Sequence, residues 1–147
     1  MTQEEKDILM RDLCARLPYG VKCSFGVDDA IYQIDGVNPT CCGASEIQAT
    51  HIKSGINGDF TLNACKPYLF PLSSMTKEQE SYLHFNTKFT LDICNDLTVK
   101  IDEDDNYFYT DIFDYVSLID WLHKNHFDYR GLIEKGLAID ATGLNIY

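Results

Sequence analysis

The stretch DYVSLIDWLHKNHFDYRGLIEKGLAIDATGLNIY, residues 114–147, decides how we expect this chain to fold. It carries the only tryptophan of the sequence and the strongest helical pattern. Apolar side chains recur there at i, i+3, i+4 and i+7 spacing, at Tyr115, Leu118, Ile119 and Leu122. This spacing predicts a helix with one face against a core. Asp114 fits the N-cap, and Lys124 with His126 would place positive charge near the C-terminal end of the helix.

A second, shorter helix is predicted over Leu132–Lys135, stopped by Gly136, because glycine tolerates the left-handed conformation best. The two helices would form a helical hairpin. Elements this short are marginal alone, so their apolar side must pack on the rest of the chain. We therefore expect Trp121 and Leu122 to be buried, together with Leu132.

The N-terminal half predicts one helix followed by a small antiparallel meander. Residues 2–17 form an amphipathic pattern in which Thr2 and Glu5 fit a capping box and Asp12 and Arg16 belong to the charged face. Pro18 ends this helix. Four strands are expected at residues 20–25, 30–34, 46–53 and 60–65, with the turn SGINGD (54–59) between the last two.

The middle of the chain is less regular. Residues 66–74 hold two prolines, which favours an extended crossing segment over a strand inside a sheet. Thr76 and Gln79 form another capping box, which predicts a helix over 77–85. Residues 87–113 return to a period of two, which predicts further strands. The expected architecture is a single α+β domain, residues 1–147: an N-terminal helix, an antiparallel sheet or small partly closed β-barrel in two halves, and the C-terminal helical hairpin packed on it.

Three segments carry a resemblance to a known family. They are LCARLPYGV (13–21), KPYLFPLSSMT (66–76) and DWLHKNHFDYRGLIEKGLAID (120–140). Together they resemble small uncharacterised proteins of Bacteroides-type gut bacteria, their phages and integrated mobile elements. The resemblance implies a source and a size class, and it transfers no reaction, cofactor or catalytic residue.

Negative charge is concentrated in the second half of the sequence. The chain has a net charge of −11, and residues 92–120 contain nine acidic side chains against a single lysine, Lys100. Such a field repels a phosphate backbone and attracts a basic protein, so no direct nucleic-acid partner is expected. Tyr107, Phe108 and Tyr109 could form an apolar centre within this acidic rim, although alternate members facing a core is the simpler explanation. The candidate partner-binding residues are Asp102, Glu103, Asp104, Asp105, Tyr107, Tyr109 and Asp111.

Six cysteines occur without a secretion signal or an apolar run of membrane-spanning length, which predicts a cytoplasmic protein with reduced and mostly buried thiols. Adjacent Cys41 and Cys42 could bind zinc together with His123 and His126, but the Cys-x-x-Cys geometry is missing. A solvated or capping role for the two histidines is the simpler hypothesis. We expect no cofactor, since the glycine-rich phosphate-binding motifs are absent. Asp102–Asn106 lacks the residues of a Ca²⁺ loop and is expected to be a solvated turn.

Two classes of function remain open. The preferred hypothesis is a non-enzymatic accessory protein that binds a basic host-encoded or element-encoded protein, with nucleic-acid mimicry as one version of it. The alternative is a small hydrolase-like or transferase-like enzyme with a Cys or Ser nucleophile in a cleft between the sheet and the C-terminal hairpin. Ser74-Met75-Thr76-Lys77 matches the S-x-x-K string of Ser/Lys acyl-transfer enzymes, but the two motifs that accompany it are missing, so capping explains Ser74 and Thr76 better. Self-association is a third possibility.

Overall fold

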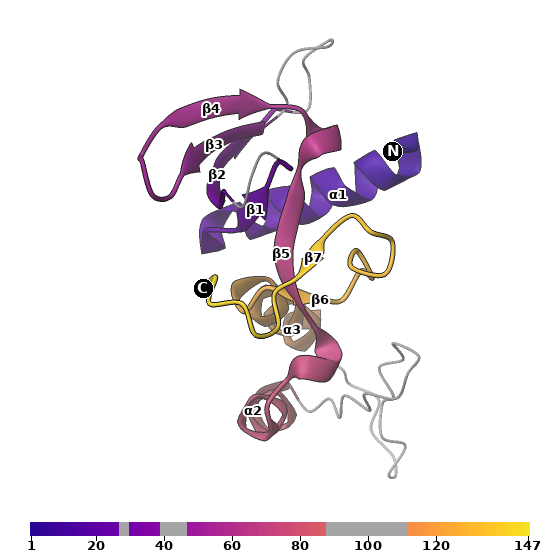
Figure 1. Ribbon diagram of the computed structural model, residues 1–147. Helices are drawn as coiled ribbons and strands as arrows, with labels where there is room; N and C mark the ends of the chain where they lie inside the picture. The colour runs from indigo at the N-terminus through magenta and orange to yellow at the C-terminus, as the bar shows by residue number, and fades with distance from the viewer. Residues whose placement is uncertain (27–29, 39–46, 88–111) are drawn as a thin grey trace.

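The computed structural model describes residues 1–26, 30–38, 47–87 and 112–147, with the side chains of 83–87 and 112–115 excepted. Its helices are α1 (Gln3–Arg16), α2 (Lys77–Thr87) and α3 (Ile112–Lys124). Its strands are β1 (Lys22–Ser24), β2 (Tyr32–Val37), β3 (Ile47–His51), β4 (Asn57–Phe60), β5 (Lys66–Pro71), β6 (Phe127–Asp128) and β7 (Ile139–Asp140). The α+β class and the N-terminal helix are confirmed (Figure 1).

The described strands form one open, mixed and mostly antiparallel sheet. Its order is β4-β3-β2-β1-β5-β6, and β7 also pairs with β5. The antiparallel meander β1 to β4 is confirmed, with a register shift between Ile34 and Gly36 in β2. The sheet does not close into the expected barrel within the described part of the chain. The expected second half of that barrel, in residues 87–113, lies almost entirely outside the described residues.

Two strand predictions were wrong. The strand expected at 60–65 begins earlier, as β4, and residues 62–64 form a 3₁₀ turn instead. Residues 66–71 are not a crossing segment but β5, which pairs antiparallel with β1 and parallel with both β6 and β7. Its two prolines, Pro67 and Pro71, stand at or near its ends, where a missing N–H costs least. In Figure 1, β5 runs through the middle of the molecule and joins its two parts.

Helix α1 follows its predicted bounds, but its buried face is different. Both hydrogen bonds of the capping box between Thr2 and Glu5 are present. Asp12 and Arg16, expected on the solvent side, are fully buried beside Leu9 and Leu13. These four positions have i, i+3, i+4 and i+7 spacing, so two charges occupy the stripe that faces the core. α1 crosses the sheet behind β5 in Figure 1.

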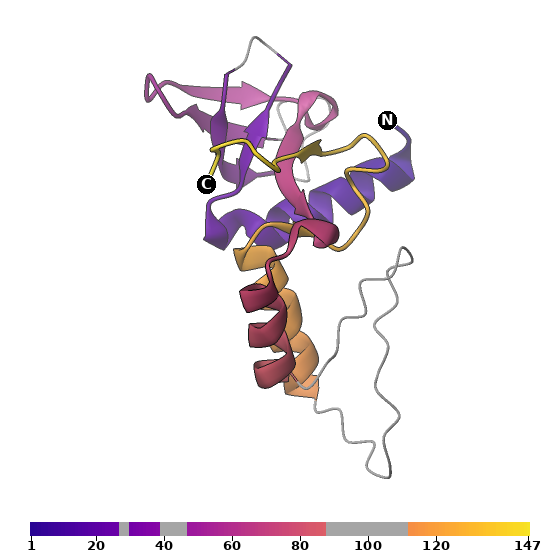
Figure 2. The same cartoon turned by 60° about the horizontal axis from the view of Figure 1, so that its bottom comes forward.

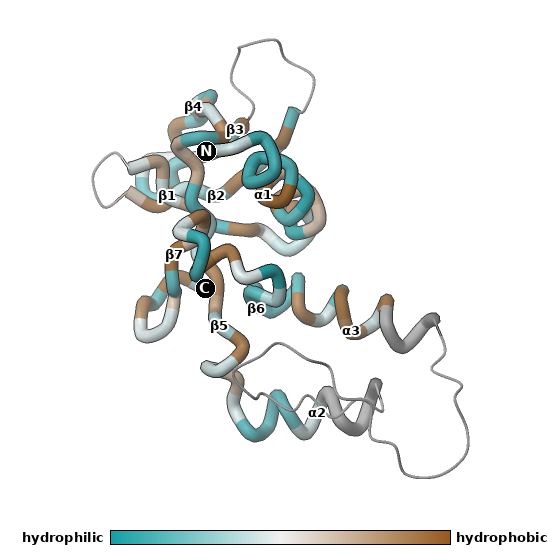
Figure 3. Tube along the Cα trace, turned by 90° about the vertical axis from the view of Figure 1, so that its right-hand side faces the viewer, coloured by the Kyte–Doolittle hydropathy of each residue, from teal (hydrophilic) through white to brown (hydrophobic). Residues whose placement is uncertain are grey.

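The hydrophobic interior has two clusters. The larger joins α1, the sheet and the turn after β6, and it includes Leu13, Ile34 and Leu132. The smaller lies between β5, β6 and α3, and its buried members are Met75, Leu118, Leu122 and Phe127. The burial expected for Leu122 and Leu132 is confirmed, and half-buried Trp121 packs against the smaller cluster. Figure 3 shows hydrophobic residues recurring along α3, as the sequence pattern predicts.

The prediction of a C-terminal helical hairpin is wrong for its second helix. Residues 132–136 form a compact turn rather than a helix. Asp128 explains it, because its carboxylate accepts hydrogen bonds from the backbone N–H groups of Leu132 (2.9 Å) and Ile133 (2.8 Å). Gly136 does take the predicted left-handed conformation, with a φ of +68°. Helix α3 also begins at Ile112, before the expected N-cap Asp114.

Helix α3 pairs instead with α2. The capping box of Thr76 and Gln79 is confirmed by Thr76 N–H to Gln79 Oε1 (2.8 Å) and Gln79 N–H to Thr76 Oγ1 (3.3 Å). The rings of Tyr82 and Trp121 stack across the two helices at 6.0 Å. The pair projects from the sheet, and the end of α2 and the start of α3 lie at the tip farthest from it (Figure 2). No helix among the described residues has the length and apolarity needed to cross a bilayer.

Candidate functional site

The chain takes an unusual conformation where α3 ends. His126 has a φ of +58°, and among the described residues it is the one non-glycine position with a positive φ. Its N–H donates to the His123 carbonyl (3.1 Å), and Asn125 donates to the Trp121 carbonyl through both its backbone and its side chain. Glycine is the usual residue at such a helix end, and a larger side chain there costs about 1–3 kcal/mol of backbone strain. Strain of this kind is concentrated at functional sites.

The imidazole of His126 is enclosed. Only 6% of the residue is exposed, and its ring stacks on Tyr147 with centroids 3.8 Å apart. Its Nδ1 is buried with no hydrogen-bond partner. Burial first, and then the charges of Arg16 and Lys22, lower the pKa of His126 to about 4, although the backbone carbonyl of Tyr19 opposes them. The ring is therefore neutral at neutral pH.

Contacts of its hydroxyl and of its ring hold Tyr147 over His126. Its hydroxyl donates to the Tyr68 carbonyl (2.8 Å) and accepts from the Lys22 N–H (3.1 Å). The Lys22 ammonium donates to the Ile146 carbonyl and lies 5.1 Å from the centre of the Tyr147 ring. Burial raises the pKa of the Tyr147 hydroxyl, so it stays protonated at physiological pH.

An open pocket of about 420 Å³ lies beside these two rings. The strand β5 and the chain after it supply Phe70, Ser74, Thr76 and Gln79. The Ser74 hydroxyl donates to the Pro71 carbonyl (2.7 Å).

The other side of the pocket comes from the end of α3, from β6 and from the last residue of the sequence. These contribute Lys124, Asn125, His126, Phe127 and Tyr147. Parallel pairing of Phe70 with Phe127 and the bond from Phe70 N–H to the His126 carbonyl (2.9 Å) hold the two sides together. We call the space lined by these nine residues the His126 pocket.

A buried ionic cluster supports this side of the pocket. Asp12 Oδ2 accepts from Arg16 Nε (2.7 Å), and Asp12 Oδ1 accepts from Arg130 Nε (3.2 Å). Arg16 also donates to the carbonyls of Phe127 (2.7 Å) and Leu122 (3.4 Å). The cluster thus ties α1 to the chain segment that carries His126.

The arrangement favours binding over proton transfer. An efficient general base has a pKa near the working pH, and the pKa of His126 is far below neutrality. The Ser74 hydroxyl is committed to a backbone carbonyl, and Thr76 caps α2, as its sequence context predicted. The pocket therefore offers aromatic walls, amide and hydroxyl groups, and one ammonium group.

His123 in α3 and His126 just after it were predicted to be solvated or capping, and this was wrong. Both are buried: His123 Nε2 bonds the Tyr129 hydroxyl (2.8 Å), and His126 stacks on Tyr147. Burial, followed by the charge of Arg16, lowers the pKa of His123. The described ranges contain no group of three or more side chains placed to hold a metal ion, and Cys41 and Cys42 lie outside them.

The other expected site residues divide between described and undescribed parts of the chain. Cys23 and Cys65 are buried free thiols, and a hydrogen bond between them, followed by burial, raises the pKa of Cys23. Cys14 is exposed, so two of the three described thiols are buried, in keeping with the prediction of mostly buried cysteines. In the described part, no hydrogen bond joins a cysteine to a histidine. The candidate partner-binding residues 102–111 lie outside the described residues.

Sequence reasoning missed the His126 pocket and the ionic cluster. The cluster had a signal, namely that Asp12 and Arg16 occupy stripe positions of an amphipathic helix. The pocket had only a weak one, since Asn125-His126 ends a helix without glycine. Comparison with protein-family models, with curated proteins and with solved structures gave no match for this chain. The resemblance to the mobile-element family stays a prediction.

Proposed function

We propose that this chain is a non-enzymatic interaction protein that binds a basic protein partner through the acidic segment between α2 and α3. The supporting observation is where that segment is attached. The chain leaves α2 at Thr87 and enters α3 at Ile112, and both ends lie at the tip of the helix pair farthest from the sheet (Figure 2). This point of attachment lies away from the larger hydrophobic cluster, which supports binding there without disturbing that cluster.

The charge distribution supports a basic partner. Residues 77–124 hold eleven acidic side chains and four lysines, a net charge of −7 out of the −11 of the whole chain. Charged patches of one sign steer oppositely charged partners and raise their association rate. Glu80 is exposed on α2 in this region, and Asp120 is exposed on α3.

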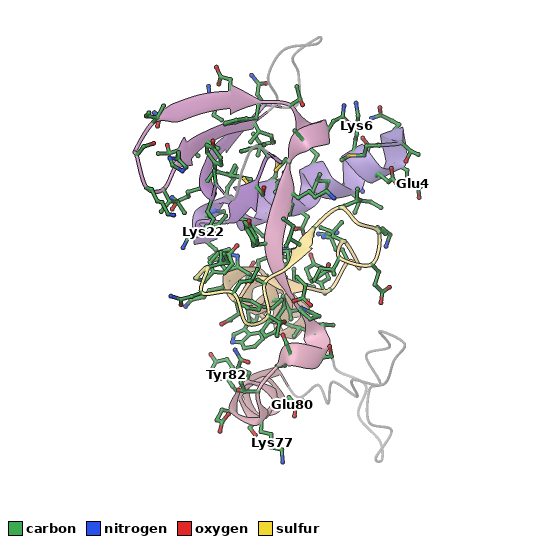
Figure 4. The ribbon with its side chains drawn as sticks, viewed as in Figure 1. Glu4, Lys6, Lys22, Lys77, Glu80 and Tyr82 are labelled. Atoms are coloured by element: carbon green, nitrogen blue, oxygen red, sulfur yellow. The ribbon has the colours of Figure 1, made fainter. Side chains whose placement is uncertain are left out.

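Ring stacking joins α2 and α3 to each other and to β6, which supports a segment attached at the end of the two helices. Tyr82 lies on the side of α2 that faces the rest of the molecule, and Lys77 lies on the opposite side (Figure 4). The stack of Tyr82 on Trp121, and of Trp121 on Phe127 (5.5 Å), connects the pair to β6. The partner would then contact the acids 102–105 and 111 together with Tyr107 and Tyr109.

The test uses three tagged baits and a lysate of the source cells. The first is the natural protein. The second is neutralised at the acidic segment by Asp102→Asn, Glu103→Gln, Asp104→Asn and Asp105→Asn. The third loses the same charge from exposed positions elsewhere by Glu4→Gln, Asp7→Asn, Asp59→Asn and Glu134→Gln.

We expect one basic protein to be enriched by the natural bait and by the third bait, and to be lost from the second. Its capture should weaken as salt is raised, because exposed charges are screened. Equal capture by all three baits, or capture of no basic protein, would contradict the proposal.

A further inference from the structure

The His126 pocket differs in charge from the rest of the chain. The protein has 23 acidic side chains, yet none of the nine residues that line this pocket is acidic. Lys124 is exposed, and among the described lining residues it is the one with a side chain charged at neutral pH, since His126 is neutral. An ammonium group with no acidic side chain among the nine lining residues favours an anion.

The walls of the pocket favour a flat ring. Phe70, Phe127 and Tyr147 line it, and Phe70 lies 6.3 Å from Phe127 and 6.0 Å from Tyr147 between ring centroids. Aromatic rings pack best on one another in offset or edge-to-face arrangements at such separations. A planar aromatic ligand that packs against these rings would remove apolar surface from water, which favours its binding.

The wall also contains an unmet polar group. His126 is more than nine-tenths buried and lines the pocket, and its Nδ1 lacks a partner. A neutral imidazole carries its proton on one nitrogen, so the tautomer protonated at Nε2 leaves Nδ1 free to accept a hydrogen bond from a ligand. Buried acceptors are normally satisfied, and an exception of this kind marks a place where a donor is missing.

We propose that the His126 pocket binds a small aromatic anion, a single ring that carries a carboxylate or phosphate group for Lys124 and a hydroxyl or N–H donor. None of the nine residues that line the pocket belongs to the acidic segment 92–111. The anion would pair with the ammonium group of Lys124, and the ring would pack against Phe70 and Phe127.

The chain supplies its own reporter. Its single tryptophan, Trp121, stacks on Phe127, which lines the pocket, so a bound ring should change the fluorescence of Trp121. The probes are 4-hydroxybenzoate, phenyl phosphate, the neutral 4-hydroxybenzyl alcohol and the cationic tyramine. We expect saturable binding of the two anions, with a dissociation constant on the order of 1 mM for such small ligands. Whichever anion binds tighter identifies the preferred group.

Three variants test the role of Lys124. Lys124→Gln should weaken anion binding by about 5-fold or more, and Lys124→Glu should abolish it. The matched control is Lys135→Gln, which removes another exposed lysine on the turn 132–136. Lys124 and Lys135, the two positions changed, are both exposed, so folding should be intact, and circular dichroism would verify this.

The proposal is overturned if no probe saturates, if the neutral alcohol binds as tightly as the anions, or if Lys124→Gln and Lys135→Gln behave alike. Neutralising the acids 102–105 should leave the binding of 4-hydroxybenzoate in place, which separates this site from the proposed partner surface.

Discussion

At the scale of single residues, His126 shows how burial changes what a side chain can do. A histidine near a helix end is expected to carry charge and to stabilise the C-terminal carbonyls. Here the ring is enclosed by Tyr147 and lies in the field of Arg16 and Lys22, so its pKa falls to about 4. The same group becomes a neutral acceptor in a pocket wall, which no feature of its sequence neighbourhood indicates.

His126 should make the protein sensitive to mild acid. Its pKa is lowered from 6.5 to about 4 in the folded state, so the unfolded state binds more protons between these values. The free energy of unfolding should therefore fall as pH drops below 6.5, by about 2 kcal/mol between pH 7 and pH 5. Urea unfolding at both pH values measures this difference.

His126→Gln should reduce the pH dependence by about the contribution of His126, and the contribution of buried His123, whose pKa is also lowered, should remain. The control His51→Gln changes a histidine on β3, away from the pocket, and should leave the dependence in place. The assignment fails if the two variants lose stability equally between pH 7 and pH 5.

At the scale of elements, helix caps were predictable and long-range pairing was not. The capping boxes of Thr2 and Thr76 are local patterns, so they located the starts of α1 and α2. The strand β5 was missed because its partners β6 and β7 are distant in sequence and its prolines locally disfavour a strand. The prediction of a second C-terminal helix was wrong because the Asp128 carboxylate accepts hydrogen bonds from the N–H groups of Leu132 and Ile133 and holds them in a turn.

Removing one member of the buried Asp12–Arg16 ion pair should destabilise the protein more than replacing both members with apolar residues. Removing Asp12 alone by Asp12→Ala leaves the Arg16 guanidinium buried without its main anion, which should cost about 3–5 kcal/mol in the free energy of unfolding. The double change Asp12→Leu with Arg16→Met removes both charges and should cost less than Asp12→Ala. Denaturant unfolding measures all three proteins.

The chain contains a matched control in the same helix. Asp7 and Arg11 have the same i, i+4 spacing on α1 and both are exposed. Asp7→Ala should change the free energy of unfolding by less than about 0.5 kcal/mol. A double variant that is less stable than Asp12→Ala would show that the charges themselves hold α1 to the segment after α3.

At the scale of the whole molecule, the two clusters of buried residues imply two levels of stability. The sheet and α1 share the larger cluster, whereas α2 and α3 depend on the smaller one and on the Tyr82–Trp121 stack. Regions with fewer buried apolar contacts open at lower free energy. Helices α2 and α3 are therefore expected to open more readily than α1 and the sheet.

Amide hydrogen exchange should therefore rank the elements. We expect the protected amides of α2 and α3 to exchange at least about tenfold faster than those of α1, β2 and β3, because opening the helix pair leaves the larger cluster intact. Tyr82→Ala should accelerate exchange in α2 and α3 further, since it removes the ring that joins them, and should leave β2 and β3 unchanged. Tyr32→Ala, which removes a ring packed against the larger cluster, should instead accelerate exchange across the sheet. If all elements exchange at one rate in the natural protein, the molecule opens as a single unit and the helix pair has no independent mobility to offer a partner.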